Sequence, residues 1–378
     1  MNPRSRFRVV AIDHGFPTTE PEEQIFRAAG GEFLNVEGRP YPVAMAFCHE
    51  AQAVMCRRIT VTEAMIEHFY TAKFLLRYGG GADNVDVPAA TLHKVMVGSI
   101  PQYCTEETAL HTIALLLACV RNLLETHRKV AAGGWDLFPP EKLGRMSRRT
   151  LGLVGFGCVG QAVAKRLQGW GLTMLASDPY ADKRRAELLG VRLVTLDALC
   201  ASSDYISLHL PLLPETRHLF NARLFALMKS GTILINTARG AVVNTEDLVE
   251  ALAERRVGRV GLDVFEEEPL PPNSPFRKHP RVLFTDHNAW YSEESQAAIQ
   301  KLAAEEVVRV CSGQLPQALA NPEVLPRIGY KAAWNPPEQL LWQLKRAKTL
   351  PPAPLPRTPL GPNVDPKLLE VAKSLRRM

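Results

Sequence analysis

The segment LGLVGFGCVGQAVAKRL, residues 151–167, constrains the fold of this chain more than any other stretch. It places Gly155, Gly157 and Gly160 between an apolar run typical of a buried strand and an amphipathic run typical of a helix. A second apolar run, LTMLAS, follows and leads to Asp178. Strand, glycine turn, helix and strand in this order form a nucleotide-binding unit of a parallel α/β sheet. We therefore predict a Rossmann domain around this segment.

The three glycines have different mechanical roles in such a unit. Gly155 permits the tight turn, Gly157 lets the backbone approach a pyrophosphate, and Gly160 allows the helix to pack closely on the strand. The helix that starts at Cys158 and Val159 directs unpaired N–H groups and its positive dipole end at the phosphates. The sequence therefore predicts a dinucleotide bound at these five positions.

The residue at position 178 indicates which dinucleotide is bound. An aspartate after the second strand accepts hydrogen bonds from the ribose hydroxyls of NAD, whereas a 2′-phosphate would face its carboxylate. We therefore predict NAD as the cofactor. The nearby basic run Lys183, Arg184 and Arg185 keeps NADP open as the less favoured alternative.

Apolar runs and helical patterns alternate through residue 290, which is typical of an α/β protein with parallel sheets. A chain of 378 residues exceeds a comfortable single core, so we expect two domains. The predicted strands include FRVVAID, AVMC, FLLRYG and KVMVG in a first series, then LGLVG, LTMLAS, VRLV, YISLHL, TILIN, VGLDV and RVLFT in a second. Between the two series we predict a connecting helix, TEETALHTIALLLACVRNLLETH, with Thr105 as its N-cap.

The composition, 46% hydrophobic and 22% charged, is that of a soluble globular protein. The longest apolar stretch, TIALLLACV, is too short to span a bilayer, and the N-terminal sequence lacks the features of a signal peptide. The seven cysteines are odd in number and scattered, without a CxxC pair. We therefore expect reduced thiols in the cytoplasm, with neither a disulfide framework nor a metal site.

The net charge of +6 belongs to the C-terminal tail. From Lys331 onward there are nine basic and three acidic residues, so the preceding chain holds 36 of each and is neutral. Nine prolines also fall in this tail, which we expect to be an extension without a long element, ending in one possible short helix, DPKLLEVAKSLRRM. No nucleic-acid-binding motif accompanies the basic residues, so we predict no nucleic-acid partner.

Six motifs follow one another in a fixed order: RYGGGADNVDVPAA, the glycine motif, SLHLPLLPETRHLFN, INTARGAVVNTEDL, GLDVFEEEP and TDHNAW. In this order they resemble the D-isomer-specific 2-hydroxyacid dehydrogenases, which include D-lactate and phosphoglycerate dehydrogenases and glyoxylate and hydroxypyruvate reductases. The resemblance covers residues 50–325. It implies a flavodoxin-like substrate domain at 1–101 and 289–330, a Rossmann domain at 102–288 inserted in it, an extension at 331–378, and a homodimer.

The resemblance assigns catalysis to Arg239, Glu268 and His287. Reduction of a 2-keto acid needs a cation that binds the carboxylate and polarises the carbonyl, which the planar fork of arginine provides. It also needs a proton donor near neutral pH, which imidazole provides, and a carboxylate that fixes the imidazole tautomer. Nicotinamide supplies the hydride. Taken singly, each residue is equally compatible with a surface or loop role.

Further positions follow from the same resemblance. The cofactor-lining ones are His209, Pro211, Thr237, Ala238 and Asp263, of which Asp263 is expected to bond the nicotinamide amide; buried structural roles are the alternative. The substrate-facing ones are Arg57, Gly79, Gly80, Gly81 and Trp290. A plain turn at the glycines, a solvated Arg57 and a packing role for Trp290 stay open.

The sequence departs from the family pattern beside the histidine. Asp286 and Asn288 stand where the family usually has proline and a small residue. The run from His287 to Glu294 is more similar to the C-terminal-binding proteins, the NAD(H)-dependent corepressor branch of the family. This gives a second hypothesis, a dinucleotide-gated dimeric scaffold with little catalysis. A formate-type dehydrogenase is disfavoured because that reaction transfers no proton, and because the resemblance to those enzymes pairs the histidine with a glutamine, whereas residue 268 is Glu.

Overall fold

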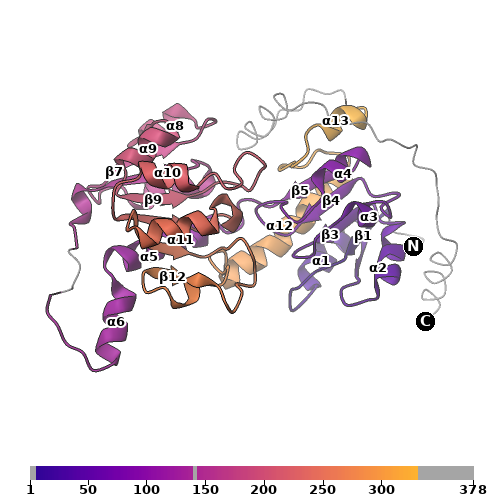
Figure 1. Ribbon diagram of the computed structural model, residues 1–378. Helices are drawn as coiled ribbons and strands as arrows, with labels where there is room; N and C mark the ends of the chain where they lie inside the picture. The colour runs from indigo at the N-terminus through magenta and orange to yellow at the C-terminus, as the bar shows by residue number, and fades with distance from the viewer. Residues whose placement is uncertain (1–5, 139–142, 331–378) are drawn as a thin grey trace. The chain divides into compact units, whose positions relative to one another are not determined.

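The computed structural model describes residues 6–138 and 143–330, and these form two compact units (Figure 1). Unit 1 holds the described residues before Cys104 and after Ser292, and unit 2 is Cys104–Ser292. The sequence led us to expect boundaries at 101/102 and 288/289. These lie two and four residues before the two boundaries of unit 2 in the structure. The C-terminal tail from Lys331, with the short helix expected at its end, lies outside the described residues.

Unit 1 is built on a five-stranded parallel sheet in the order β2-β1-β3-β4-β5, which is the flavodoxin-like order. All four strands expected in this region form, and the edge strand β2 was not predicted. It is only partly buried and lacks an apolar run, so no periodic signal marked it. The strands are β1 Phe7–Ala11, β2 Gly31–Asn35, β3 Ala53–Cys56, β4 Phe74–Arg77 and β5 Met96–Ser99.

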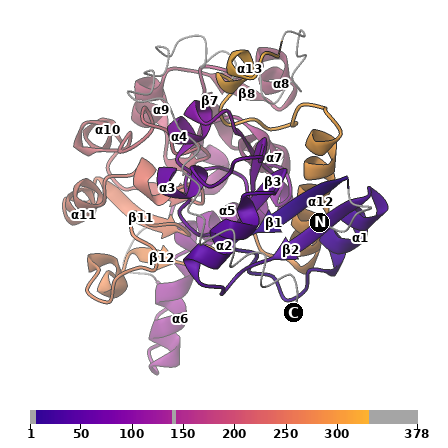
Figure 2. The ribbon, with the colours of Figure 1, turned by 90° about the vertical axis from the view of Figure 1, so that its right-hand side faces the viewer.

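Helices cover both faces of this sheet. Helices α2, α3 and α4 bury one face, and α1 and α12 bury the other, where they lie side by side (Figure 2). Helix α12 comes from the far end of the chain, from the segment 289–330 that the resemblance assigned to this domain. The helices are α1 Glu20–Ala28, α2 Tyr41–Cys48, α3 Glu63–Ile66, α4 Val87–Leu92, α12 Glu293–Cys311 and α13 Val324–Arg327.

Unit 2 is built on a seven-stranded parallel sheet in the order β12-β11-β10-β9-β6-β7-β8. Strands β6 to β11 have the Rossmann order, with β6 at the point where the strand order reverses, and β12 extends the edge beside β11. The prediction of an α/β fold with a Rossmann domain is confirmed. The strands are β6 Thr150–Val154, β7 Thr173–Ser177, β8 Val191–Leu193, β9 Tyr205–Leu208, β10 Thr232–Asn236, β11 Val257–Leu262 and β12 Val282–Phe284.

The sheet of unit 2 is also covered on both faces. Helices α9, α10 and α11 bury one face (Figure 1), and α5, α7 and α8 bury the other. The helices are α5 Thr105–Val120, α6 Leu123–Ala131, α7 Cys158–Arg166, α8 Lys183–Leu188, α9 Leu196–Ser202, α10 Ala222–Leu227 and α11 Thr245–Ala253, with short 3-10 turns η1 Met146–Arg148, η2 Gly240–Val242 and η3 Pro275–Lys278.

The prediction of one connecting helix from Thr105 is wrong in two details. The N-cap is Cys104, and the helix breaks after α5 because Asn122 adopts a left-handed conformation with φ 51°. Asn122 stabilises the break by donating from Nδ2 to Glu125 Oε2 at 2.7 Å. Within the described chain no single helix has the length and apolar character of a membrane span; α5 and α6 together, bent by 61°, meet that criterion by length and composition only.

Candidate active site

The glycine turn after β6 has the close approaches that its sequence predicts. A Cβ added at Gly155, where φ is +89°, would lie 2.5 Å from the carbonyl oxygen of His209, and one added at Gly160 would lie 2.5 Å from the carbonyl oxygen of Gly155. No atom lies within 4 Å of a Cβ added at Gly157. The turn is therefore closed on the protein side and open at Gly157, where α7 begins with Cys158 and Val159.

Asp178 follows β7 and forms a hydrogen bond to the backbone of the glycine turn. Its carboxylate accepts hydrogen bonds from the backbone N–H groups of Phe156 and Tyr180, each at 2.8 Å. A carboxylate has about four lone-pair positions, so further hydrogen bonds from a ligand remain possible. This geometry is compatible with binding of ribose hydroxyls beside the turn.

The residues after β9 lie against the same turn. The backbone N–H of His209 donates to Val154 O at 2.7 Å, and its ring carbon Cδ2 would lie 3.6 Å from a Cβ at Gly160. The ring nitrogen Nε2 is buried and has no hydrogen-bond partner among the described residues. Burial lowers the pKa of His209 to about 4, so the ring is neutral at neutral pH. Pro211 is exposed, and its carbonyl accepts from Thr216 Oγ1 at 2.7 Å.

The loop after β10 positions Arg239. Asn236, the last residue of β10, accepts from the N–H of Ala238 at 3.0 Å and donates to the carbonyl of Arg239 at 2.9 Å. The guanidinium Nη1 of Arg239 donates to Ala238 O at 2.7 Å. Thr237 is buried and shares a 2.7 Å hydrogen bond with Thr112 of α5. These bonds fix the backbone on both sides of the arginine.

Gly240 brings the arginine loop against the loop that carries Glu268. Its backbone packs so closely on Phe265 that an added Cβ would overlap the carbonyl carbon of that residue. The N–H of Phe265 in turn donates to Glu268 Oε1 at 2.9 Å. The arginine and the glutamate therefore stand on two loops in direct backbone contact.

Glu268 and His287 form a short hydrogen bond. The distance from Nδ1 of His287 to Oε2 of Glu268 is 2.6 Å, and the side chains are 43% and 35% exposed. The other ring nitrogen, Nε2, has no hydrogen-bond partner in the described part of the chain. The pair thus has the arrangement of a proton donor and the carboxylate that orients it.

The charge state of Glu268 is set by its neighbours. Burial alone would raise the pKa of this carboxyl, but the hydrogen bond and charge of His287, the N–H of Phe265 and the charge of Arg239 outweigh burial and lower the pKa. Glu268 is therefore ionised at neutral pH. It can stabilise a positive charge on the imidazole.

Asp263 anchors the loop that carries His287. Its side chain is 1% exposed and accepts hydrogen bonds from Thr285 Oγ1 at 2.6 Å and from the N–H groups of Asn288 and Ala289, each at 3.0 Å. Its carbonyl accepts from the N–H of His287 at 2.8 Å. These bonds hold His287 in a left-handed conformation with φ +59°, which costs free energy in a residue with a Cβ. In this structure Asp263 therefore bonds the loop that carries His287.

Comparisons with known proteins show which family the chain belongs to. Residues 113–289 match the family described as "D-isomer specific 2-hydroxyacid dehydrogenase, NAD binding domain". A glyoxylate reductase from Korarchaeum cryptofilum is 38% identical over 256 residues, which cover 67% of this chain and 77% of the relative. The chain belongs to the D-isomer-specific 2-hydroxyacid dehydrogenase family.

Two further members of this family show how far the similarity extends. A D-3-phosphoglycerate dehydrogenase from Methanocaldococcus jannaschii is 37% identical over 268 residues, covering 71% of this chain but 51% of the relative, so the chain matches about half of that longer protein. The structure of D-lactate dehydrogenase from Aquifex aeolicus with NAD and lactic acid has a TM-score of 0.71 and 25% identity, covering 81% of this chain and 96% of the other.

In unit 1, the candidate substrate-binding residues lie at the carboxyl ends of neighbouring strands. Arg57 follows β3, donates to the carbonyl of Gly15 and stacks over the Phe16 ring, 4.1 Å from the ring centre. Its own carbonyl accepts from Nε of Arg77 at 3.1 Å, which ties it to the end of β4 just before the triple glycine. The structure thus brings together Arg57 with Gly79, Gly80 and Gly81 at one sheet edge.

The unusual neighbours of His287 do not point at its ring. Asp286 accepts from Asn288 Nδ2 at 2.7 Å, and both side chains are exposed. Trp290 is half-buried and packs edge-on against Tyr291, with ring centres 5.5 Å apart. The departure from the family pattern therefore leaves the Glu268–His287 pair intact.

The sequence did not predict the roles of two further residues of the site, although both lie in the motifs quoted above. Thr285 lies between Asp263 and the ring of His111, whose Nε2 is 3.0 Å from Thr285 Oγ1. Gly240 was recognised only as part of a motif. Their roles depend on contacts between loops that are far apart in sequence, so no local pattern reveals them.

Proposed function

We propose that this protein interconverts a D-2-hydroxy acid and the corresponding 2-keto acid with NAD(H). The observation that carries the proposal is the 2.6 Å hydrogen bond between Glu268 and His287, with Arg239 acting on the same carboxylate. A charged carboxylate, an imidazole and a guanidinium in one neighbourhood are the groups that such a reaction requires.

Each group has a distinct task in the proposed mechanism. Arg239 binds the substrate carboxylate and polarises the carbonyl. His287 transfers the proton between its Nε2 and the substrate oxygen, because Nδ1 is held by Glu268. In the reduction direction the imidazole loses a proton, and in oxidation it gains one, while Glu268 remains ionised. A nicotinamide dinucleotide held at the glycine turn would supply or take up the hydride.

The residues of the glycine turn fit a nicotinamide dinucleotide. The open space at Gly157 admits a pyrophosphate against the start of α7, and Asp178 is placed to accept hydrogen bonds from ribose. We propose NAD in preference to NADP because a 2′-phosphate would meet the Asp178 carboxylate. The buried, unpartnered Nε2 of His209 is a further polar atom beside this turn.

The test is oxidation of NADH with a panel of 2-keto acids: glyoxylate, hydroxypyruvate, pyruvate, and branched, aromatic and thioether-bearing acids. We expect turnover of at least one of them, with the products in the D configuration. The matched control is His287→Asn, which keeps a polar side chain but cannot transfer the proton. Absence of turnover with every acid, while NADH still binds, would support the scaffold hypothesis in place of catalysis.

We also propose that the protein is a homodimer. Five large apolar side chains around α6 and the segment after it are strongly exposed, among them Trp135 at 78%, Leu137 at 82% and Phe138 at 85%. Several large apolar side chains exposed within one segment favour an interface with another chain. Sedimentation of the wild type and of Trp135→Ser with Phe138→Ser tests this, and we expect a dimer to become a monomer.

A further inference from the structure

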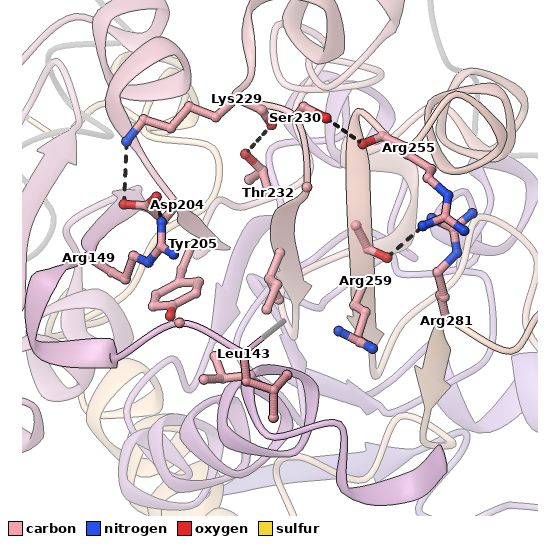
Figure 3. Close-up of a pocket in the computed structure, with 15 residues that line it drawn as sticks. Leu143, Arg149, Asp204, Tyr205, Lys229, Ser230, Thr232, Arg255, Arg259 and Arg281 are labelled. Atoms are coloured by element: carbon pink, nitrogen blue, oxygen red, sulfur yellow. Dashed lines mark hydrogen bonds and ion pairs between the residues drawn. The ribbon is translucent and has the colours of Figure 1, made fainter. Parts of the chain in front are cut away.

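Unit 2 contains a cavity of about 360 Å³ at the edge of its sheet where the strands begin (Figure 3). It is lined by the first residues of neighbouring strands, including Tyr205 of β9 and Thr232 of β10. The glycine turn and the catalytic loops follow the carboxyl ends of the same strands. The cavity is therefore separate from the site described above, and its volume is within the range of about 300–1,000 Å³ that small-molecule sites occupy.

The charge of the lining is strongly positive. Five of the lining residues are basic and one is acidic, a balance of +4: Arg149, Lys229, Arg255, Arg259 and Arg281 against Asp204. Asp204 is paired with Arg149 at 2.9 Å and Lys229 at 3.4 Å. Burial alone would raise the pKa of Asp204, but the Thr150 N–H and these two cations lower it, so its single negative charge persists.

Helix ends explain only part of this concentration of charge. Lys229 and Arg255 follow the C-termini of α10 and α11, where a cation interacts favourably with the helix dipole. The helix dipole does not account for Arg259, because Arg259 lies within strand β11. Its side chain is only 12% exposed. Glu125, which is not part of the lining, approaches it at 3.7 Å. Figure 3 shows Arg259 extending toward the open middle of the cavity.

The walls of the cavity are held in place by hydrogen bonds that need no ligand. Ser230 Oγ donates to Arg255 O at 3.2 Å, and the N–H of Gly231 donates to the same oxygen at 3.0 Å. A Cβ added at Gly258 would lie 2.6 Å from Gly231 O, so the start of β11 is also in close contact with the loop before β10. Lys229 and Arg255 are thus carried on loops that are fixed to each other, as a preformed site requires.

We propose that this cavity binds a small polyanion carrying two or more phosphate or carboxylate groups. Guanidinium groups bind both kinds of group through paired hydrogen bonds, and a ligand of this charge would offset the repulsion among the five cations. Because the ligand binds the folded protein, it raises the free energy of unfolding.

The test is isothermal titration of the full chain with inorganic pyrophosphate, with citrate as the polycarboxylate arm and sodium chloride at matched ionic strength as the control. The titration is run both without and with saturating NADH, so that binding of pyrophosphate at the glycine turn is distinguished from binding in the cavity. The variants are Lys229→Gln and Arg255→Gln, both at exposed positions, and the matched control is Arg192→Gln, an exposed arginine of β8 outside the cavity.

We expect one anion per chain, with a Kd that rises about tenfold or more in each cavity variant, as expected for loss of a charged hydrogen bond, and is unchanged in Arg192→Gln. The melting temperature with pyrophosphate should rise in the wild type and less in the cavity variants. Two results would overturn the proposal: no saturable binding at millimolar pyrophosphate or citrate, or the same Kd in the wild type and both cavity variants. If NADH fails to bind, the proposed cofactor site is in doubt, but the comparison between variants still tests the cavity.

Discussion

Replacement of Gly240 by alanine tests how the active site is held together. The backbone of Gly240 lies against Phe265, and an added Cβ would be well inside the 3.0 Å that real Cβ atoms essentially never cross. The two loops would have to separate by more than about 1 Å to restore even that minimum distance. Since the obstructing atoms are backbone, no side-chain rotation relieves the overlap.

The expected cost follows from what the two loops carry. Arg239 stands on one and Glu268, with its 2.6 Å bond to His287, on the other. A misplacement of about 1 Å in a catalytic group can cost about 10²-fold in rate, equivalent to roughly 2.7 kcal/mol. Overpacking of this kind also lowers the free energy of unfolding by about 1–3 kcal/mol.

The assay is steady-state reduction of the best keto acid, together with NADH binding by fluorescence. We expect Gly240→Ala to lose more in turnover than in NADH affinity, because the glycine turn is on another loop, whereas Arg239 and Glu268 stand on the two loops that must separate. The control is Gly190→Ala, where φ is +68° but no atom lies within 4 Å of the added Cβ, so only local backbone strain is introduced. Wild-type turnover in Gly240→Ala would refute the reasoning.

Three further predictions concern single polar groups. His287→Asn should lower turnover by at least about 10²-fold with little change in NADH affinity, measured by steady-state kinetics and fluorescence titration. Glu268→Gln should lower the free energy of unfolding at pH 7; because the folded-state pKa of Glu268 is lowered, the difference from wild type should shrink as the pH falls below about 4, measured by urea unfolding. Asp178→Ser should weaken NADH binding by about tenfold and NADPH binding less, measured by competitive titration; equal losses for both would remove Asp178 as the discriminating residue.

The sequence by itself determined the α/β class and most of the strands. Parallel strands buried on both faces are continuous apolar runs, so each expected run became a strand, whereas the partly buried β2 had no such run and was missed. The glycine turn could also be predicted, because its glycines lie in a strand–turn–helix–strand unit that is continuous in sequence; of their close approaches, that of Gly160 to Gly155 O lies within this unit. Local order along the chain is sufficient for features of this kind.

Only the tertiary structure decided how the separate loops meet. Nothing near Asp263 in sequence indicates that its carboxylate bonds the loop of His287, or that Gly240 rests on Phe265. The helix break at Asn122 and the five cations around the cavity were equally invisible, because those cations come from segments spread between Arg149 and Arg281. Contacts across a sheet edge depend on strand order, and strand order is fixed by the packing of the whole unit.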